Sequence, residues 1–431
     1  MSIKCWWTYS KTIALLLSAE RNIRPRFSVC LLEVAAQHRS LSRSPAPEET
    51  SMRKQILLVI SALLIAGLAC AADGPAATPT PRVPEAKLDF QTDAPVWPDG
   101  TAHGFFPSPP DVTFQSVLTH FEDLGEHADF ILIQPNVPWQ DFVDGVEGES
   151  KSREDLRNQV VLAEMNGLAW AFVIDPLNGL NRREFFGLPE GWEATFSNPD
   201  IRRAFSNFTV WCLREFDPPY LGLASEINTY MDAHSGDVEH YLSLYKEVYA
   251  QIKAEDPGTD VFVTFQWDDL NNMFPAAAEG RQAYDTNWEQ VELFEPELDV
   301  WAMSSYPYFV FNGQPIPDDY YTPLADRTDK PLAISEGGFS SKSFGPIVSS
   351  PEAQVGYLEA IDGQIGDRLA FWVYLILSDL NMDSVQDAMS MNGMSERDID
   401  TLSMFATIGL RESDGTPKPA LEVWDRLREA R

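Results

Sequence analysis

Two glutamates stand where short apolar runs of this chain stop, and they are its best-placed groups for chemistry. Glu226 follows the run Tyr220–Ala224, and Glu336 follows the run Pro331–Ile334. Because an unpaired buried charge loses much of its hydration energy, a buried strand normally ends at a turn residue rather than at an acid. The two endings therefore predict a pair of carboxyl groups aimed into one site. Paired carboxylates at the ends of barrel strands are the groups that hydrolyse glycosidic bonds.

Other polar and aromatic residues in or just after apolar runs fit the same chemistry. These candidates are His103, Trp139, Asp175, Trp267 and Trp372. Carboxylates can bind sugar hydroxyls, and a flat indole face can cover the C–H surface of a sugar. Each candidate also has a structural alternative, because a tryptophan is often plain core and a buried polar group often satisfies backbone atoms.

Two other kinds of chemistry find no support in the sequence. No cluster of His, Cys and Asp has the spacing of metal ligands, and no serine occupies a Gly-x-Ser-x-Gly turn. We therefore expect a carbohydrate ligand, with no metal or other cofactor.

The elements that must position these residues alternate between strands and helices. Eight apolar runs have the length of buried strands: Ala102–Phe106, Ala128–Ile133, Ala169–Ile174, Tyr220–Ala224, Val261–Phe265, Leu298–Met303, Pro331–Ile334 and Leu369–Leu377. Near-continuous apolar strands are typical of a parallel sheet buried on both faces. With helical stretches between them, they predict a single (β/α)8 TIM barrel over residues 99–431. An open doubly wound sheet is the alternative, and the lack of a Gly-rich phosphate loop after the first run disfavours it.

Apolar stripes with helical spacing support this alternation. They comprise Tyr241, Tyr245, Val248 and Ile252, then Val355, Leu358, Ile361 and Ile365, and a last helix is expected over Pro419–Arg431. Cys212 continues a further stripe formed by Ile201, Phe205 and Phe208. We therefore predict that Cys212 is a buried packing residue rather than a nucleophile.

The charge of the chain restricts its partners. The formal net charge is -33 at pH 7. Such a surface repels nucleic acid, anionic lipid and acidic polysaccharides, so we expect a neutral glycan as substrate and a monomeric protein. The alternative is that the acidic surface only keeps the protein soluble.

The segment 52–72 has the pattern of a signal peptide. It begins with basic residues, continues through an apolar stretch and ends in small residues. The apolar stretch is too short for a comfortable transmembrane helix. Cys70 resembles the acylated cysteine of bacterial lipoproteins, which predicts an exported protein held at the cell surface or in the periplasm by an N-terminal lipid. Ordinary cleavage and full secretion are the alternative.

The segments on either side of this signal have no predicted fold. Residues 73–98 are rich in Pro, Ala and Thr, a composition typical of a disordered linker. Residues 1–51 are basic and lack clean periodicity, so we interpret them as an upstream extension of the reading frame or as disordered chain.

The ends of the apolar runs resemble the clan A glycoside hydrolases, which share a (β/α)8 barrel. Ser225–Asn228 matches the segment that carries the acid/base glutamate after strand four, and Ile334–Gly338 matches the segment that carries the nucleophile glutamate on strand seven. Ser304–Tyr308 resembles the strand-six segment, and its Tyr306 corresponds to the tyrosine that contacts the nucleophile. Trp372 resembles the strand-eight tryptophan beneath the sugar. Within the clan, the strand-six and strand-seven motifs most resemble family 53, the endo-β-1,4-galactanases.

One position departs from the pattern of the clan. The residue before the acid/base glutamate is usually an asparagine that binds the sugar 2-hydroxyl, whereas this chain has Ser225 there. Asn228 is the proposed substitute, because residues two apart on a strand share a face.

The resemblance implies a retaining hydrolase that acts on a β-linked glycan by double displacement, with Glu336 as nucleophile and Glu226 as acid/base. Two alternatives stay open at this point. One is a surface glycan-binding lipoprotein whose barrel has lost turnover, and the other is a transglycosylase that uses the same residues.

Overall fold

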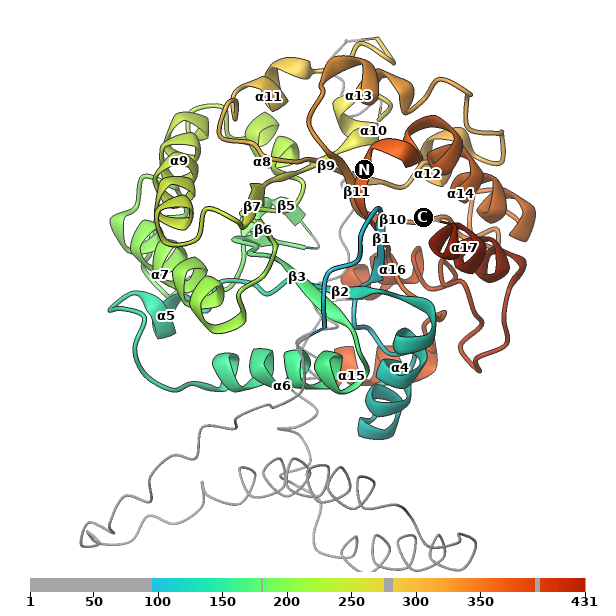
Figure 1. Ribbon diagram of the computed structural model, residues 1–431, viewed down its shortest axis with the longest axis horizontal. Helices are drawn as coiled ribbons and strands as arrows, with labels where there is room; N and C mark the ends of the chain where they lie inside the picture. The colour runs from blue at the N-terminus through green and yellow to red at the C-terminus, as the bar shows by residue number, and fades with distance from the viewer. Residues whose placement is uncertain (1–94, 180, 275–281, 392–395, 431) are drawn as a thin grey trace, which may run out of the picture. The chain divides into compact units, whose positions relative to one another are not determined.

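The computed structural model describes residues 95–179, 181–274, 282–391 and 396–430 (Figure 1). The predicted segments 1–51 and 52–72, with Cys70, lie outside the described residues, as does most of the predicted linker 73–98. Among the residues that the structure describes, no helix is both long and apolar enough to cross a bilayer.

The described chain forms a ring of parallel strands. In chain order these are β1 (Ala102–Phe105), β2 (Phe130–Ile133), β3 (Ala169–Val173), β6 (Tyr220–Gly222), β7 (Asp260–Phe262), β8 (Thr264–Gln266), β9 (Trp301–Ser305), β10 (Leu332–Gly337) and β11 (Leu369–Tyr374). The sheet order is β7-β6-β3-β2-β1-β11-β10-β9-β8. Only Val263 separates β7 from β8, which together form the fifth strand of the barrel. The ring therefore has eight strand positions, and the predicted (β/α)8 barrel is confirmed.

Helices surround the ring (Figure 1). The longer ones are α4 (Phe114–His127), α6 (Lys151–Met165), α7 (Pro199–Phe216), α9 (Val238–Glu255), α14 (Pro351–Ile365), α15 (Met382–Met391) and α17 (Pro419–Glu429). Shorter helices are α5 (Trp139–Phe142), α8 (Ile227–Ala233), α10 (Trp267–Leu270), α11 (Trp288–Glu292), α12 (Tyr308–Phe311), α13 (Thr322–Arg327), α16 (Glu396–Ser403) and the 3₁₀ turn η3 (Gly366–Arg368).

Local sequence explains where several helices begin and which face they bury. The side chains of Thr113, Ser150, Asn198 and Ser350 accept backbone N–H bonds at the starts of α4, α6, α7 and α14. The predicted stripe of α9 is fully buried, and Cys212 lies buried in α7 as expected. In α14 only Val355 of the predicted stripe is partly exposed.

Aromatic side chains fill the barrel near the beginnings of its strands. The ring of Phe371 lies 5.9 Å from Phe130, 5.0 Å from Tyr220 and 5.7 Å from Phe262, which come from three other strands. Trp97 joins this cluster at 4.5 Å from Phe130. The predicted linker 73–98 therefore extends too far, because Trp97 already belongs to the packed domain.

A hairpin that the sequence did not predict follows β3. Its antiparallel strands are β4 (Leu177–Asn178) and β5 (Asn181–Phe185). The backbone N–H of Phe186 donates to the carbonyl of Pro176, and a ring nitrogen of His234 lies 2.6 Å from the carbonyl oxygen of Arg183. The first contact closes the hairpin, and the second joins it to the residue that follows α8.

Candidate active site

The two glutamates named by the sequence face one arginine. Glu226 directly precedes α8 and Glu336 lies in β10, and each is only 3% exposed. Nε of Arg182 donates to Oε2 of Glu226 at 3.2 Å, and Nη2 of Arg182 lies 3.8 Å from Oε2 of Glu336. Because a single planar guanidinium reaches both carboxylates, the structure brings the two glutamates together at the carboxyl end of the barrel.

Glu226 occupies an unusual backbone conformation. Its φ of 49° is in the left-handed region, which costs a residue with a Cβ about 1–2 kcal/mol. The backbone N–H of Glu226 donates to Oγ1 of Thr264 at 2.8 Å, and Oγ of Ser304 donates to Oε1 of Glu226 at 2.6 Å. Strained backbone held in this way is common at functional sites. The turn directs the carboxylate into the ring of strands.

Glu336 has a simpler environment. The hydroxyl of Tyr306 donates to its Oε1 at 2.6 Å, which is the contact that the resemblance implies. Its Oε2 has no hydrogen-bond partner among the described residues and lies 3.8 Å from Nη2 of Arg182. One oxygen of Glu336 is therefore held in place while the other is not hydrogen-bonded.

Arg182 connects the carboxylates to a third acid. Its Nη1 donates to Oδ2 of Asp175, and its Nη2 donates to Oγ of Ser225 at 3.2 Å. Asp175 also accepts from Nε2 of Gln134 at 3.1 Å and from the backbone N–H of Leu177 at 3.1 Å. Asp175 and Arg182 are 0% and 1% exposed. Asp175 therefore positions Arg182 through a buried ion pair.

Burial dominates the electrostatics of this cluster. It raises the pKa of Asp175 and of Glu226, against the opposing effect of Arg182. Burial and then the charge of Glu226 raise the pKa of Glu336 to about 8. The pair therefore holds a proton at neutral pH. The bonds that Ser304 and Arg182 donate to Glu226 oppose the rise in its pKa, and the bond that Tyr306 donates to Glu336 does the same there.

The raised pKa of Glu336 gives a stability prediction for Glu336→Gln. The pKa of Glu336 is about 8 in the folded protein against an ordinary 4.5, so ionisation favours the unfolded chain. Below pH 4.5 the group is neutral in both states, and the folded protein loses stability as the pH rises from there to about 8. The neutral glutamine removes this loss. We expect the Tm of Glu336→Gln to exceed that of the parent by a margin that grows between pH 5 and pH 8.

Calorimetry across that pH range measures the margin. Glu126→Gln is the matched control, because Glu126 is an exposed glutamate of α4. A Tm difference for Glu336→Gln that stays constant with pH contradicts the prediction.

Trp372 and His103 require a correction, because they lie on the outer face of the strand ring. Their rings lie 5.4 Å and 4.9 Å from the ring of Trp424 in α17. Successive strand residues alternate between faces, so Phe371 points into the barrel while Trp372 points toward the helix. In this structure neither Trp372 nor His103 can contact a sugar held by the glutamates.

Asn228 also differs from its prediction. It belongs to α8 rather than to a strand, so it does not share a face with Glu226 in the way that strand geometry implies. Its Oδ1 accepts from the backbone N–H of Gln266 at 2.8 Å, and its Nδ2 donates to the carbonyl of Gln266 at 3.3 Å. Both ends of this amide are therefore hydrogen-bonded to the backbone of Gln266, the last residue of β8.

The two remaining tryptophans are buried. Trp139 is 2% exposed, and its Nε1 donates to the carbonyl of Phe186 at 2.7 Å, which braces the hairpin that carries Arg182. Trp267 is fully buried between Trp288 and Tyr320, at ring distances of 5.8 Å and 6.1 Å. Neither indole has an exposed face in this structure.

Asp268 contacts the site through Tyr306, although the sequence did not assign it a role. It is fully buried, and its Oδ2 accepts from the backbone N–H of Tyr306 at 2.8 Å and from Nε2 of Gln266 at 2.9 Å. The hydroxyl of Tyr320 donates to its Oδ1. Asp268 therefore positions the segment whose tyrosine holds Glu336.

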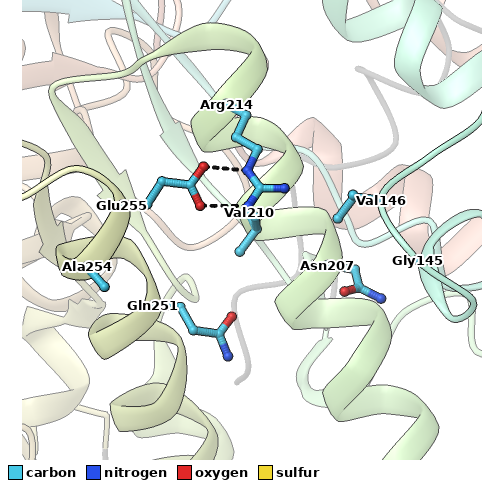
Figure 2. Close-up of a pocket in the computed structure, with 8 residues that line it drawn as sticks. All are labelled: Gly145, Val146, Asn207, Val210, Arg214, Gln251, Ala254 and Glu255. Carbon is cyan, nitrogen blue, oxygen red and sulfur yellow. Dashed lines mark hydrogen bonds and ion pairs between the residues drawn. The ribbon is translucent and has the colours of Figure 1, made fainter.

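A separate hollow of about 730 Å³ lies on the outer helical layer (Figure 2). It is lined by Asn207, Val210 and Arg214 of α7, by Gln251, Ala254 and Glu255 of α9, and by Gly145 and Val146. Arg214 and Glu255 form a half-exposed ion pair at its rim, and such pairs contribute little energy. The hollow is not part of the glutamate site, which lies inside the strand ring.

The fold and this site define a (β/α)8 barrel in which two glutamates at the carboxyl end of the strands lie beside one arginine. No family model matches the chain, and no curated protein matches it. The exo-beta-1,4-mannosidase Op5Man5 from Opitutaceae bacterium strain TAV5 is similar in structure, with 13% identity over 77% of this chain and a TM-score of 0.51. This chain spans 59% of the length of that protein.

Two GH5_18 proteins are similar over more of their own length. One from Bifidobacterium longum subsp. longum shares 14% identity over 77% of this chain and 78% of that chain, with a TM-score of 0.55. One from Streptomyces cattleya shares 14% identity over 77% of this chain and 81% of that chain, with a TM-score of 0.54. Both were solved in complex with Manb1-4GlcNAc. At such identity the likeness establishes the barrel fold, while the resemblance to family 53 stays a prediction.

Proposed function

We propose that this protein is a retaining glycoside hydrolase that cleaves a neutral β-linked oligosaccharide or polysaccharide. The observation that carries the proposal is the pair Glu226 and Glu336, which face one guanidinium at the carboxyl ends of the strands. A retaining mechanism requires two carboxyl groups about 5–5.5 Å apart across the scissile bond. The contact of Tyr306 with Glu336 adds support, because it fixes the nucleophile at one oxygen.

The proposed reaction has two displacements. Glu336 attacks the anomeric carbon, the bond to the leaving oxygen breaks, and Glu226 gives that oxygen its proton. Glu226 then takes a proton from water, the water oxygen attacks the same carbon, and the ester bond to Glu336 breaks. The first step therefore requires Glu226 to carry a proton and Glu336 to be ionised.

The charge of the site supports a neutral substrate. Three buried carboxylates, from Asp175, Glu226 and Glu336, surround the single guanidinium of Arg182. An anionic sugar placed there meets excess negative charge in a poorly hydrated region. We propose a β-1,4-linked hexoside as substrate, since the motifs resemble galactanases and the similar barrels include a β-1,4-mannosidase.

A substrate panel tests the proposal. β-1,4-Galactan, β-1,4-mannan and β-1,4-glucan, with their oligosaccharides, are incubated with the protein, and the reducing ends released are measured. We expect release from at least one member and none from the Glu336→Gln variant. Release that persists unchanged in Glu336→Gln rules out the assigned site.

A second candidate is a glycan-binding barrel that has lost turnover. Three observations favour it: Arg182 is ion-paired to Glu226, Ser225 replaces the usual asparagine, and each glutamate is only 3% exposed. An activated 2-fluoro glycoside distinguishes the two candidates. A hydrolase releases a burst of leaving group and carries the sugar on Glu336, whereas a binding protein does neither. A transglycosylase also gives the burst but transfers the sugar to an acceptor rather than to water.

We also propose that the protein is exported as a monomer, with the segment 52–72 as signal peptide and Cys70 as the lipidated residue. The sequence of that segment supports export, and the formal net charge of -33 supports a monomer. Mass spectrometry of the mature N-terminus separates a diacylglyceryl cysteine from plain cleavage.

A further inference from the structure

We propose that Arg182 and Glu336 together bind the sugar hydroxyl on the carbon next to the anomeric carbon. Arg182 is then a specificity-determining residue, and it restricts the substrate to sugars with a free 2-hydroxyl. The resemblance to known hydrolases assigned no role to the hairpin that carries Arg182. The inference rests on the proposed function, because it takes Glu336 to be the group that meets the anomeric carbon.

An acceptor and a donor lie close together in the site without bonding to each other. Oε2 of Glu336 accepts no hydrogen bond within the described residues, although the side chain is buried. Nη2 of Arg182 lies 3.8 Å from this oxygen and donates to Oγ of Ser225 at 3.2 Å. Because Nη2 carries two hydrogens, one N–H is left for a further acceptor. A buried carboxylate oxygen without a donor is costly, so the two atoms suit a ligand that bonds to both.

A hydroxyl group matches both atoms. With Glu336 ionised, as the first step requires, the hydroxyl donates its hydrogen to Oε2 and accepts from Nη2 of Arg182. An oxygen about 2.8 Å from each atom can span their separation of 3.8 Å. An ether oxygen has no hydrogen for Oε2, and an acetamido N–H has no lone pair for Nη2. Of the groups on a sugar ring, a hydroxyl is therefore the one that satisfies the pair.

The orientation of Glu336 identifies which hydroxyl this is. Tyr306 binds its Oε1 at 2.6 Å, and in the proposed reaction the carboxylate lies against the anomeric carbon. That carbon has two neighbours in the sugar ring, the ring oxygen and C2. The ring oxygen has no hydrogen to donate, so the hydroxyl on C2 is the nearest group that can bond to both atoms. Sugars with hydrogen or an acetamido group on C2 should therefore be poor ligands.

The hairpin holds the guanidinium ready for this contact. Nη1 of Arg182 donates to Asp175, whose carboxylate also accepts from Nε2 of Gln134 at 3.1 Å. Trp139 braces the end of β5 through the carbonyl of Phe186. Arg182 is 1% exposed, so water screens its hydrogen bonds poorly. A donor that is fixed before the sugar arrives loses little conformational entropy on binding.

Other polar groups near the glutamates are already engaged. Ser304 and Tyr306 each donate their hydroxyl hydrogen to a glutamate. Asn228, which the sequence suggested as the ligand of this hydroxyl, is bonded at both ends of its amide to the backbone of Gln266. Of these groups, Arg182 is the one with a donor left for the sugar.

Paired substrates with and without the 2-hydroxyl test the inference. The 4-nitrophenyl β-glycosides of galactose, mannose and glucose are compared with the matching 2-deoxy glycosides, and kcat/KM is measured in the parent and in Arg182→Met. A hydrogen bond from a charged donor corresponds to roughly 10–150-fold in kcat/KM. We expect removal of the hydroxyl to cost the parent at least about tenfold more in kcat/KM than it costs Arg182→Met.

Matched variants keep the test decisive. Arg183→Met removes a charge from the exposed face of the same hairpin, and its ratio of kcat/KM between the two substrates should equal the parental ratio. Arg182→Lys serves if the methionine variant does not fold, because it keeps a cation for Asp175 but loses the fork of donors. Its ratio should also fall. A parental ratio in the folded Arg182 variants overturns the inference.

Binding without turnover separates this inference from the proposed function. Disaccharides with sulfur in place of the glycosidic oxygen resist hydrolysis, and calorimetry measures their affinities with and without the 2-hydroxyl. Discrimination that is lost in Arg182→Lys supports the hydroxyl site even in a protein that cleaves no glycan of the panel, which contradicts the hydrolase. Turnover with equal ratios in the parent and the Arg182 variants overturns the hydroxyl site while the hydrolase stands. A protein that neither binds nor cleaves any of these sugars overturns both.

Discussion

Glu336→Ala is expected to abolish turnover of a β-glycoside with an activated aryl leaving group, and azide is expected to restore the reaction with an α-glycosyl azide as product. Removing the side chain leaves space where the nucleophile stood, so azide attacks the anomeric carbon from that face. A single displacement inverts the configuration. We expect the loss to exceed the 10²–10⁴-fold contribution that is typical of a general acid, because no covalent intermediate forms.

Glu226→Ala gives the complementary result. The activated leaving group needs no proton, so the first step survives and the glycosyl-enzyme on Glu336 accumulates. Azide then attacks that intermediate in place of water, and two inversions give a β-glycosyl azide. On an unactivated glycan the same variant should lose about 10²–10⁴-fold in rate, because the leaving oxygen must depart without its proton.

The anomeric coupling constant of the azide product, measured by NMR, distinguishes the two outcomes. Glu126→Ala is the control, since this exposed glutamate of α4 should give parental rates with and without azide. Products with exchanged configurations assign the roles in the opposite sense, with Glu226 as nucleophile. Parental turnover in either variant refutes the carboxylate pair.

The strands of the barrel were predictable because parallel strands buried on both faces appear as short continuous apolar runs. The same property hid which way each side chain points. In β11 (Leu369–Tyr374) both faces are apolar, so the sequence alone cannot show that Trp372 faces α17 rather than the barrel interior. The run that ends before Glu226 had a similar ambiguity. Its strand stops at Gly222, so Asn228 falls in a helix.

Arg182 could not be found from the sequence for a different reason. The hairpin that carries it has strands of two and five residues, and the longer one, Asn181–Phe185, is polar up to its last residue, so neither forms an apolar or alternating run. Its partner Glu226 follows β6, and its partner Glu336 lies in β10. Both come close to Arg182 only in the folded barrel. The sequence could reveal which residues end the strands, whereas the cation that joins them depends on tertiary placement.

The last large effect is expected at the buried ion pair between Lys418 and Asp379. Nζ of Lys418 donates to Oδ1 of Asp379 at 2.5 Å, to Oγ of Ser341 at 2.9 Å and to the carbonyl of Gly409 at 2.8 Å. The Lys418 and Asp379 side chains are 4% and 5% exposed. Ser341 follows β10, the strand that contains Glu336, and Asp379 follows β11. The bonds therefore join both segments to Lys418 at the start of α17.

Lys418→Met should lower the free energy of unfolding by about 3–5 kcal/mol at neutral pH, the usual cost of leaving one member of a buried pair without its partner. Burial raises the pKa of Asp379 to about 7 even with the lysine present, against an ordinary 3.8. Without the lysine its ionisation is still less favourable. The loss should therefore be largest above pH 7 and should shrink as the pH falls and Asp379 takes up a proton.

Urea denaturation at a series of pH values measures this loss, and a double variant isolates its cause. Lys418→Met combined with Asp379→Leu removes the stranded charge, so we expect it to recover most of the lost stability. Lys342→Met is the matched control, because Lys342 also faces Asp379 but is 53% exposed at 3.9 Å, and it should cost no more than about 1 kcal/mol. A double variant less stable than Lys418→Met alone would show that the hydrogen bonds of this cluster, rather than a stranded charge, hold the segment after β10 in place.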